Sequence, residues 1–464
     1  MTSIWLLGVL ALLLGFLMLG RMLASTGCSY KAKIFCSALF VSGRRPDDIL
    51  ANDVGVDDLS VLRHFSSHVD YASKRVTVSF WGLVRRTAVY RGRLGCALEY
   101  QAATDAGGMS SASTQKDLQG HLSSPARPTL REHTSTLGKV TYPSLHNVIN
   151  AAFAEQAGSP RRRTRAVVIL HHGRLVAEQY AEGFGPDTPL LGWSMAKTVI
   201  NALAGILVGQ GRLSLTGELP QSFWREPFDS RRAITLDHLL RMTSGLDFHE
   251  DYRSPFKDVI RMLLHHPDAA AYAARKPLRT PPGSVWHYSS GNTNIISRVM
   301  RDAIGNERAY LTFPKEALFD PLGMEHAVLE TDGSGTFVGS SFMYATARDW
   351  ARFGALYLQD GVCEGRRVLP EGWVSYSTTT TPQATDACYG AHLWLRVPRE
   401  FRKLEGPARA LPTAWHAVGY EGQFTSIIPS HQLVVVRLGL TRRPDAWDHE
   451  DFLWQILQAI APSS

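Results

Sequence analysis

A serine and a lysine three positions apart are the residues of this chain best suited, by type and spacing, to nucleophilic catalysis. Ser194-Met195-Ala196-Lys197 opens a segment, up to Gly209, whose apolar residues recur at helical spacing. Positions i and i+3 of a helix share a face, so the Lys197 amine could accept the proton of the Ser194 hydroxyl. The N–H groups of the helix N-terminus would lie near a developing oxyanion. The pattern indicates a lysine-activated serine nucleophile, with no metal or organic cofactor implied.

The same spacing of serine and lysine occurs twice more, so spacing alone is weak support. Ser113-Thr114-Gln115-Lys116 lies in a stretch rich in Ala, Ser, Gly and Gln, and Ser254-Pro255-Phe256-Lys257 has a proline between its serine and its lysine. Only Ser194 opens a long amphipathic helix after a turn that contains glycine. Ser194 is therefore the candidate nucleophile.

Three motifs in order resemble those of the serine β-lactamase and penicillin-binding-protein superfamily. They are GWSMAKT at 192–198, WHYSSGNTN at 286–294 and AVGYEGQ at 417–423. The resemblance runs from about Tyr142 to the C-terminus. It is closest to the branch that includes class C β-lactamases, related esterases and 6-aminohexanoate-dimer hydrolases. It implies an α/β (α+β) fold, in which an antiparallel sheet is flanked by helices and accompanied by a helical subdomain.

The resemblance also implies a role for each motif residue. Ser194 would attack an amide or ester carbonyl, Lys197 would take its proton, and Tyr288 would pass a proton to the leaving group. The backbone N–H groups of Ser194 and Tyr420 would hold the oxyanion. The expected partner is a small amide or ester, such as a short amide oligomer, hydrolysed through an acyl-enzyme intermediate. Further substrate contacts are expected at Asn292, Gly419, Gly422 and Gln423.

Two positions depart from the family pattern. Many relatives carry Asn two residues after the tyrosine, where this chain has Ser290, although Asn292 lies nearby. Many also open the third motif with Lys or His, where this chain has Ala417. His416 precedes it, but neighbours on a strand face opposite sides, which favours a packing role for His416. Without a cation to attract a carboxylate, we expect weak or no hydrolysis of penicillin-type substrates.

Other interpretations compete with this one. Residues 192–196 resemble the G-x-S-x-G elbow of α/β-hydrolases, but an elbow needs a buried strand directly before it and leaves Lys197 without a role. A catalytically silent, membrane-anchored binding or scaffold protein could use the same fold. A cell-wall D-Ala-D-Ala peptidase would need its domain to face the periplasm. The adjacent pairs His171-His172 and His265-His266 lack metal-ligand spacing.

The composition divides the chain into four parts. Residues 1–24 hold an uncharged apolar run at 4–20, long enough for a short membrane span, so we expect a transmembrane anchor or an export signal. Residues 25–100 form an accessory segment with short strands within 75–100, and 101–141 read as a linker. Residues 142–464 form the hydrolase-like domain.

The charges around the apolar run bear on which side of the membrane the domain faces. No Lys or Arg precedes the apolar run, and Arg21, Lys31 and Lys33 follow it. The positive-inside rule alone would leave the C-terminal bulk in the cytoplasm. The location that we expect is the bacterial inner membrane with the domain facing the periplasm.

The charge and the cysteine content bear on the binding partners and on the redox compartment of the protein. The net charge of +7 over 464 residues is weak support for an anionic partner, and no zinc-finger, RNA-recognition or homeodomain pattern accompanies it, so we expect no nucleic acid partner. The five cysteines show no C-x-x-C spacing. A Cys36–Cys96 disulfide would form in an oxidising compartment, and buried free thiols are the alternative.

Periodicity predicts the main elements of the domain. Residues 166–180 contain two β-branched runs around His172-Gly173, which is typical of a hairpin. Helical patterns cover 194–209, 346–361 and 448–461, and two strands are expected within 425–440. Strands at both ends of the domain and helices between them predict an antiparallel sheet covered by helices.

Overall fold

The computed structural model describes residues 2–100, 142–155, 157–220, 223–402 and 411–461. The chain forms two compact units. The first combines residues 1–116 with 248–269 and 331–335, and the second comprises 117–247, 270–330 and 336–464. The expected linker at 101–141 and the Ser113–Lys116 tetrapeptide lie outside the described residues. The division into four parts stays a prediction, and sequence patterns gave no sign that two short segments of the C-terminal region join the N-terminal unit.

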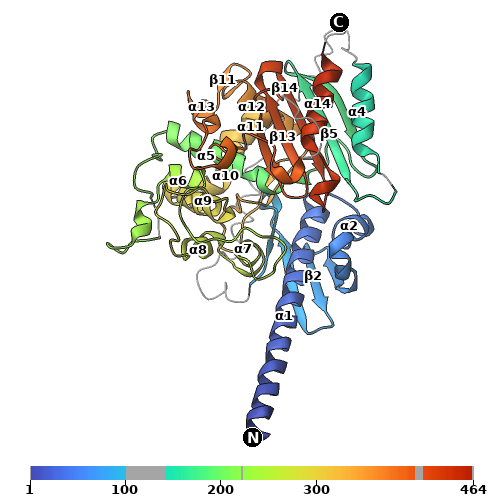
Figure 1. The fold of residues 1–464 in the computed structure, drawn as a ribbon, viewed down its shortest axis with the longest axis vertical. Helices are drawn as coiled ribbons and strands as arrows, with labels where there is room; N and C mark the ends of the chain where they lie inside the picture. Colours follow the sequence, from blue (N-terminus) through green and yellow to red (C-terminus); the bar gives the residue numbers. More distant parts are fainter. Residues whose placement is uncertain (1, 101–141, 156, 221–222, 403–410, 462–464) are drawn as a thin grey trace. The chain divides into compact units, whose positions relative to one another are not determined.

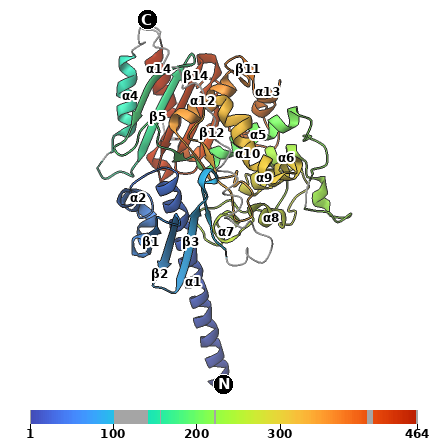
Figure 2. The ribbon, with the colours of Figure 1, turned by 180° about the vertical axis from the view of Figure 1, so that it is seen from behind.

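The first unit is built on one long helix. Helix α1 (Thr2–Phe40) packs along a four-stranded antiparallel sheet in the order β1 (Ser66–Asp70), β2 (Arg75–Phe80), β3 (Val84–Tyr90) and β4 (Cys96–Leu98) (Figure 2). The short helices α2 (Pro46–Asn52) and α7 (Asp258–His265) also contact α1, and the 3-10 helix η1 (Asp57–His64) leads into β1. The expected strands within 75–100 are confirmed.

The packing of α1 changes abruptly along its length. Most of the described large apolar side chains up to Leu23 are exposed, Met22 is half-buried, and full burial begins at Ala24. From there a row of small residues four apart lies on one face: Ala24, Cys28, Ala32 and Cys36. Small side chains let the sheet approach the helix closely, and Val76 and Val78 of β2 are buried as well. Half of α1 is therefore a core helix, and the other half has an apolar surface that this unit leaves uncovered.

Buried polar groups fix the second half of α1. The Lys31 amine donates to the carbonyl oxygens of Leu62 at 2.9 Å and Phe65 at 2.6 Å, at the end of η1. The Sγ atoms of Cys36 on α1 and Cys96 on β4 lie 2.9 Å apart, and both residues are fully buried. Of the two states that the sequence left open for this pair, the structure has buried free thiols.

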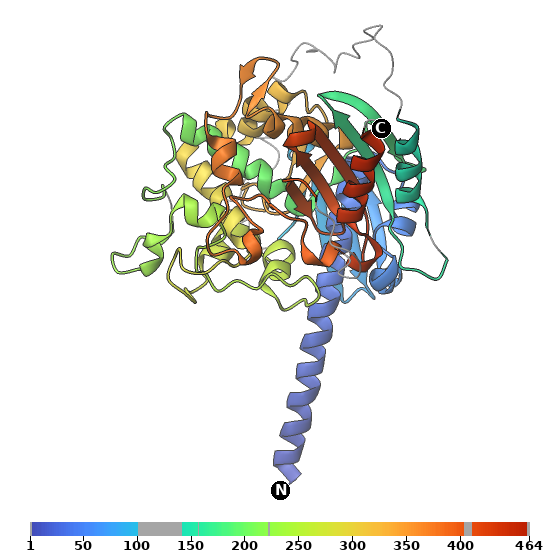
Figure 3. The same ribbon diagram turned by 45° about the horizontal axis from the view of Figure 1, so that its top comes forward.

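The second unit contains a five-stranded antiparallel sheet in the order β12 (Trp415–Gly419), β13 (Gln423–Ile428), β14 (Leu433–Gly439), β5 (Thr164–His171) and β6 (Arg174–Tyr180). Figure 3 shows the early strands in green beside the late strands in red. The pairing of β5 with β14 joins the two sequence ends of the domain. The hairpin expected at 166–180 and the strand pair expected at 425–440 are confirmed.

Alternating side chains cover both faces of this sheet. Val167 and Ile169 of β5 join a core with α4 (Pro143–Phe153) and α14 (His449–Ile460). On the opposite face, α12 (Ala347–Leu358) packs so closely that a Cβ on Gly354 would lie 2.6 Å from the Cγ1 of Val434. Thr346 caps α12 in a capping box with Asp349, as the sequence pattern indicated.

Helices between the two sets of strands carry most of the motifs. A 3-10 turn, η4 (Trp193–Met195), leads into α5 (Ala196–Gly209), which packs on α9 (Ser290–Ile304). A small sheet has the order β7 (Leu190–Leu191), β9 (Met343–Ala345) and β8 (Val328–Leu329), and β7 directly precedes η4 in the chain. The remaining described elements of five or more residues are α6 (Leu236–Leu240), α8 (Ala269–Ala274), α10 (Glu307–Pro314), η6 (Lys315–Phe319) and α13 (Trp373–Thr378).

A buried chain of hydrogen bonds links the sheet to α14. The Trp447 indole N–H donates to His449 Nδ1 at 3.2 Å, which leaves the proton of His449 on Nε2, 2.8 Å from Ser426 Oγ. The Ser426 hydroxyl can then donate to His416 Nδ1, also at 2.8 Å. Both imidazoles are neutral in this arrangement. Burial lowers the pKa of His416 to about 3 and the pKa of His449 well below its ordinary value. His416 has the packing role that its position predicted.

These neutral histidines make the second unit sensitive to acid. Between about pH 6.5 and pH 3 the unfolded chain binds protons that the folded chain excludes, so stability falls as the pH falls through this window. At pH 5 the loss from His416 alone is about 2 kcal/mol. We expect His416→Asn, which can still accept from Ser426, to be less stable at pH 7 but to lose less stability between pH 7 and pH 5. Urea denaturation at several pH values measures this.

The matched control for that experiment is His146→Asn, because His146 lies on the exposed face of α4. It should leave both the midpoint and its pH dependence unchanged. An equal pH dependence in His416→Asn and in the wild-type protein would show that His416 already takes up a proton in the folded state.

Candidate active site

Ser194 and Lys197 are brought into direct contact at the start of α5. The Lys197 Nζ atom lies 2.8 Å from Ser194 Oγ, and the Lys197 side chain is 1% exposed. Ser194 sits within η4, directly after Trp193, whose backbone φ is +48°. A bulky residue rarely adopts that conformation, so the surroundings must hold the turn in place. Functional sites often contain such strained residues.

Two other elements complete the surroundings of the Lys197 amine. Its Nζ atom is 3.0 Å from Ser290 Oγ, at the first turn of α9, and 2.9 Å from the carbonyl oxygen of Ser340. The Ser340 loop passes close to α5, because a Cβ on Gly339 would lie 2.4 Å from the Cγ1 of Ile200. The amine therefore has hydrogen-bonding partners in three directions, which fixes its position beside Ser194.

A buried histidine, His392, contacts the backbone of Lys197. His392 Nδ1 lies 3.1 Å from the Lys197 carbonyl oxygen, and its Nε2 lies 3.2 Å from the Thr293 hydroxyl. Burial, and in second place the Lys197 amine when it is charged, lowers the pKa of His392 to about 3. A neutral imidazole can donate from Nδ1 and accept at Nε2, and it satisfies both contacts. His392 therefore holds the first turn of α5 against α9.

Tyr288 lies close to the Lys197 amine, within a group of aromatic side chains. The Lys197 Nζ atom is 5.0 Å from the centroid of the Tyr288 ring. That ring lies 5.6 Å from Trp394 and 6.0 Å from Tyr389, and Trp286 packs against the same two side chains. We call Trp286, Tyr288, Tyr389 and Trp394 the aromatic wall. It surrounds Tyr288 with apolar surface beside Ser194 and Lys197.

The third motif touches the nucleophile turn through backbone. A Cβ on Gly419 would lie 2.1 Å from the carbonyl oxygen of Gly192, so only glycine allows this approach. The rings of Trp193 and Tyr420 also meet edge to face, with centroids 5.7 Å apart. The backbone of Tyr420 is thereby held next to the turn that carries Ser194.

A buried ion pair braces this junction. Glu421 accepts a hydrogen bond from the Trp193 indole at 2.9 Å and pairs with Arg442. The side chains of Glu421 and Arg442 are only 2% and 6% exposed. The strained Trp193 and the turn at 419–422 are thus joined through one carboxylate. Glu421 is a positioning residue that the motif comparison did not single out.

The structure places Asn292 and Gln423, two of the predicted substrate contacts, in the interior of the second unit. Asn292 is buried and accepts from the Ser244 hydroxyl at 2.7 Å, and it is Ser290 that contacts Lys197. Gln423 is buried too: its amide donates to the Gly439 carbonyl at 2.7 Å and its Oε1 accepts from the Gly439 N–H at 2.9 Å. Their polar atoms serve the protein itself, because side chains that begin α9 and β13 at these positions point into the interior.

Gly422 has a structural explanation of the same kind. Its φ is +77°, and a Cβ there would lie 2.6 Å from the Arg437 guanidinium. Arg437 is fully buried and donates to the Gly422 carbonyl at 2.7 Å. The conformation and packing of this turn therefore account for glycine at 422 without a substrate contact.

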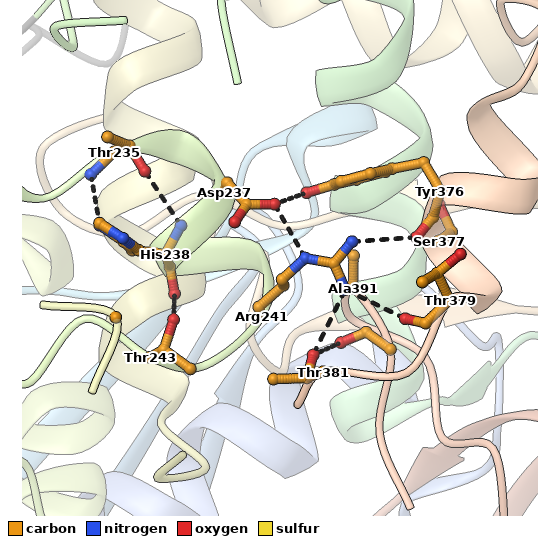
Figure 4. A network of polar contacts seen from close by, with 12 residues as sticks. Thr235, Asp237, His238, Arg241, Thr243, Tyr376, Ser377, Thr379, Thr381 and Ala391 are labelled. Carbon is orange, nitrogen blue, oxygen red and sulfur yellow. Dashed lines mark hydrogen bonds and ion pairs between the residues drawn. The ribbon is translucent and has the colours of Figure 1, made fainter. Parts of the chain in front are cut away.

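A polar network holds α6 behind the second motif (Figure 4). Asp237 accepts from the Arg241 guanidinium at 2.9 Å and from the Tyr376 hydroxyl at 2.6 Å, and Arg241 also donates to the Thr379 carbonyl. The next residue, Met242, accepts the Ser289 N–H at its sulfur at 3.4 Å. The network thus fixes the segment against which the Tyr288–Ser290 turn rests.

The surroundings of Ser194 also decide between the competing catalytic folds. The strand directly before the nucleophile turn is β7, which has only two residues and pairs antiparallel with β9. An α/β-hydrolase elbow requires a buried strand of a parallel sheet at this place. In the described part of the chain, no group of three or more His, Cys, Asp or Glu side chains is arranged to hold a metal ion.

Comparison with known proteins agrees with this geometry. A family model described as Beta-lactamase matches residues 149–458, and the chain belongs to this family. A 6-aminohexanoate-dimer hydrolase from Paenarthrobacter ureafaciens is 27% identical over 225 residues, which are 46% of this chain. That match spans only 56% of the curated relative's own length.

Two solved structures share the fold. A penicillin-binding protein homologue from Caulobacter crescentus is 18% identical, with a TM-score of 0.52 over 69% of this chain and 97% of the other. A family VIII carboxylesterase is 14% identical, with a TM-score of 0.53 over 68% of this chain and 96% of the other. The expected β-lactamase/transpeptidase-like fold is confirmed.

The brace at Glu421 can be tested separately from the chemistry. Glu421→Gln keeps an acceptor for Trp193 but removes the carboxylate charge that pairs with buried Arg442, so we expect a loss of about 3 kcal/mol in stability. The loosened turn should lower kcat roughly tenfold, a fraction of what removal of an oxyanion donor costs. KM should change little. Steady-state kinetics on an activated ester, together with urea denaturation, measure both effects.

Glu178→Gln is the matched control, because Glu178 pairs with Arg348 between β6 and α12 and both side chains are partly exposed. It should cost at most about 1 kcal/mol and leave kcat unchanged. An unchanged kcat in Glu421→Gln would mean that the brace serves folding alone.

Proposed function

We propose that this protein is a serine hydrolase that cleaves a small amide or ester through an acyl-enzyme intermediate. The observation that carries the proposal is the 2.8 Å contact between Lys197 Nζ and Ser194 Oγ in buried surroundings. Burying an amine costs several kcal/mol unless its hydrogen bonds are satisfied. A silent scaffold on this fold would gain stability by replacing Lys197 with an apolar residue, whereas a hydrolase needs the amine.

The contacts of Lys197 support its role as the general base. In the neutral amine, one lone pair can accept the Ser194 proton while the two N–H groups donate to Ser290 Oγ and the Ser340 carbonyl. The Ser194 oxygen then forms a bond with the substrate carbonyl carbon. Tyr288 passes a proton to the leaving amine or alkoxide as the carbonyl re-forms and the bond to that group breaks, and the proton held by Lys197 returns to Tyr288. Water then gives a proton to Lys197 as it attacks the acyl-Ser194 ester, and that proton returns to Ser194 Oγ as the acid leaves.

The proposed oxyanion site is formed by the backbone N–H groups of Ser194 and Tyr420. Support comes from the contact of Gly419 with Gly192 and from the Trp193–Tyr420 ring pair, which hold both backbones at one junction. The N-terminus of α5 adds a favourable dipole for a negative oxygen. Of the four residues predicted to contact the substrate, Gly419 belongs to this proposed oxyanion site, because it lies directly against Gly192.

The aromatic wall supports a substrate with an apolar or linear chain. The curated relative is named for an amide dimer and one structural neighbour for ester hydrolysis, and both reactions suit a serine with one activating amine. Position 417 is a buried alanine, and His416 is neutral within the sheet. A carboxylate-bearing β-lactam or a D-Ala-D-Ala peptide would find no positive charge at these two positions.

We further propose that α1 anchors the protein in a membrane. An apolar helix of this length near the N-terminus can be either a membrane span or an export signal. Continuity favours an anchor, because the same helix runs into the core of the first unit and supplies the buried row from Ala24 to Cys36. The bacterial inner membrane and its periplasmic side remain predictions.

Removing the nucleophile tests the proposed chemistry. Ser194→Ala should lower kcat/KM for p-nitrophenyl esters at least about a thousandfold with an unchanged unfolding midpoint, and Lys197→Ala should cost nearly as much because the two residues act as one unit. Ester hydrolysis followed by absorbance measures this.

Ser254→Ala is the control, since Ser254 and Lys257 repeat the same spacing before α7. Its activity should equal that of the wild type. A folded Ser194→Ala variant with full activity would remove Ser194 from the mechanism.

Penicillin-type substrates should be poor. Because position 417 lacks a cation for the substrate carboxylate, we expect kcat/KM for nitrocefin to be at least about a hundredfold below that for a short p-nitrophenyl ester, the cost of one missing charged contact. Parallel assays on one preparation compare the two. Equal efficiency would mean that another group binds the carboxylate.

A further inference from the structure

The turn between β2 and β3 presents two large apolar side chains to the outside of the first unit. Trp81 is 79% exposed and Leu83 is 78% exposed. The Phe80 ring stacks on Trp81 at 4.6 Å and meets Phe65 at 4.7 Å, so a row of aromatic rings runs from the core to the tip. An exposed pair of this kind at the end of a hairpin indicates a contact outside the unit.

The backbone of this turn is poorly suited to tryptophan. The Leu83 N–H donates to the Phe80 carbonyl at 3.0 Å, and φ is +47° at Trp81 and +71° at Gly82. Positive φ at both central residues defines a type I′ turn, which strongly favours Asn-Gly or Asp-Gly. A bulky side chain at the first of these positions is strained. Folding of the hairpin therefore does not explain Trp81.

The turn lies where α1 leaves the unit. Cys28 Sγ is 3.8 Å from the Val84 carbonyl oxygen, and the rings of Phe40 and Tyr90 are 5.7 Å apart, so β3 and α1 run in the same direction. The turn precedes Val84 and is therefore level with the residues just before Cys28. Figures 1 and 2 show the end of this hairpin beside α1 from opposite sides.

The bare half of α1 has the dimensions of a bilayer core. Trp5, 76% exposed, and Leu23 are separated by about 27 Å along the helix, close to the roughly 30 Å of a hydrocarbon core. Tryptophans concentrate at the two interfaces of membrane proteins, and arginines suit phosphate headgroups. Trp5 marks one end of the span, and Trp81, with the exposed Arg21 and Arg85, marks the other.

We propose that Trp81 and Leu83 form a second membrane contact, in which the β2–β3 turn enters the interface of the bilayer that α1 spans. The occupant of this surface is lipid, because the turn continues the apolar surface of α1. The contact rests on the proposed anchor and is independent of the hydrolase chemistry. It would fix the rotation and tilt of the first unit against the bilayer, which a single helix cannot do.

A fluorescent label at the turn tests this contact in the full chain. Leu83→Cys is labelled with an environment-sensitive dye in a protein whose half-buried Cys363 and Cys388 are replaced by serine, while the other three cysteines are buried. The protein is reconstituted into vesicles of phosphatidylcholine and phosphatidylglycerol. We expect blue-shifted emission, several-fold weaker quenching by iodide, and strong quenching by spin-labelled lipid.

Tyr71→Cys is the matched control. Tyr71 is 61% exposed in the β1–β2 turn and contacts Phe40, about 25 Å farther along α1 than Leu23. A label there should stay open to iodide. Equal iodide quenching at positions 83 and 71 in floating vesicles would overturn the contact and leave the anchor standing. Failure of the full chain to float with vesicles would overturn both the lipid contact and the anchor. If protection of the label at position 83 from iodide rises with the protein-to-lipid ratio, the turn contacts a second copy of the chain, and the lipid contact is overturned.

A second variant separates lipid contact from folding. Trp81→Asn creates the Asn-Gly pair that type I′ turns prefer, so it should raise the thermal midpoint in detergent. In vesicles it should increase iodide quenching of a label at position 83. A lower midpoint would show that Trp81 is needed for packing and would contradict the proposal.

Discussion

The buried amine of Lys197 is the interaction on which the candidate site depends. An amine taken out of water must have its hydrogen bonds satisfied, and each of its partners comes from a different segment. Ser194 comes from its own turn, Ser290 from the start of α9, and the Ser340 carbonyl from a loop near β9. His392 adds a fourth segment through the Lys197 carbonyl. The first three of these segments, which helices separate in sequence, thus meet at one nitrogen atom, and the fourth holds the backbone of the same lysine.

Close backbone packing gives the site its second constraint. Gly192 lies under the Trp350 ring, Gly419 lies against Gly192, and neither position has room for a Cβ. The strained Trp193 directly follows Gly192, and its indole donates to Glu421 in the turn after Gly419. Rigid placement of this kind stabilises a transition state, because donors need not reorganise as charge develops. The site is therefore held by packing and by one buried ion pair rather than by flexible surface contacts.

Local patterns predicted the elements, and tertiary contacts decided which polar residues serve the site. The hairpin at 166–180, the helix after Ser194 and the capped helix at Thr346 each carry a periodicity or a cap that is visible in sequence. The contact of Ser194 with Lys197 follows from helix geometry. No such pattern marks Ser340, His392 or Glu421. Ser340 and His392 lie over 140 residues from Lys197 in the sequence, and Glu421 lies over 220 residues from Trp193, so their roles arise only from tertiary contacts. The burial of Asn292 and Gln423 was equally invisible, because a motif does not reveal that a side chain points inward.

Labelling with a fluorophosphonate probe, followed by peptide mass spectrometry, shows whether Ser194 is an activated nucleophile, because the probe bonds only to an activated serine. We expect one labelled peptide with the phosphonate on Ser194, and no label after Lys197→Ala. The same folded protein with no label, or with the label on another serine, would contradict the assignment of Ser194 and Lys197 as a catalytic pair.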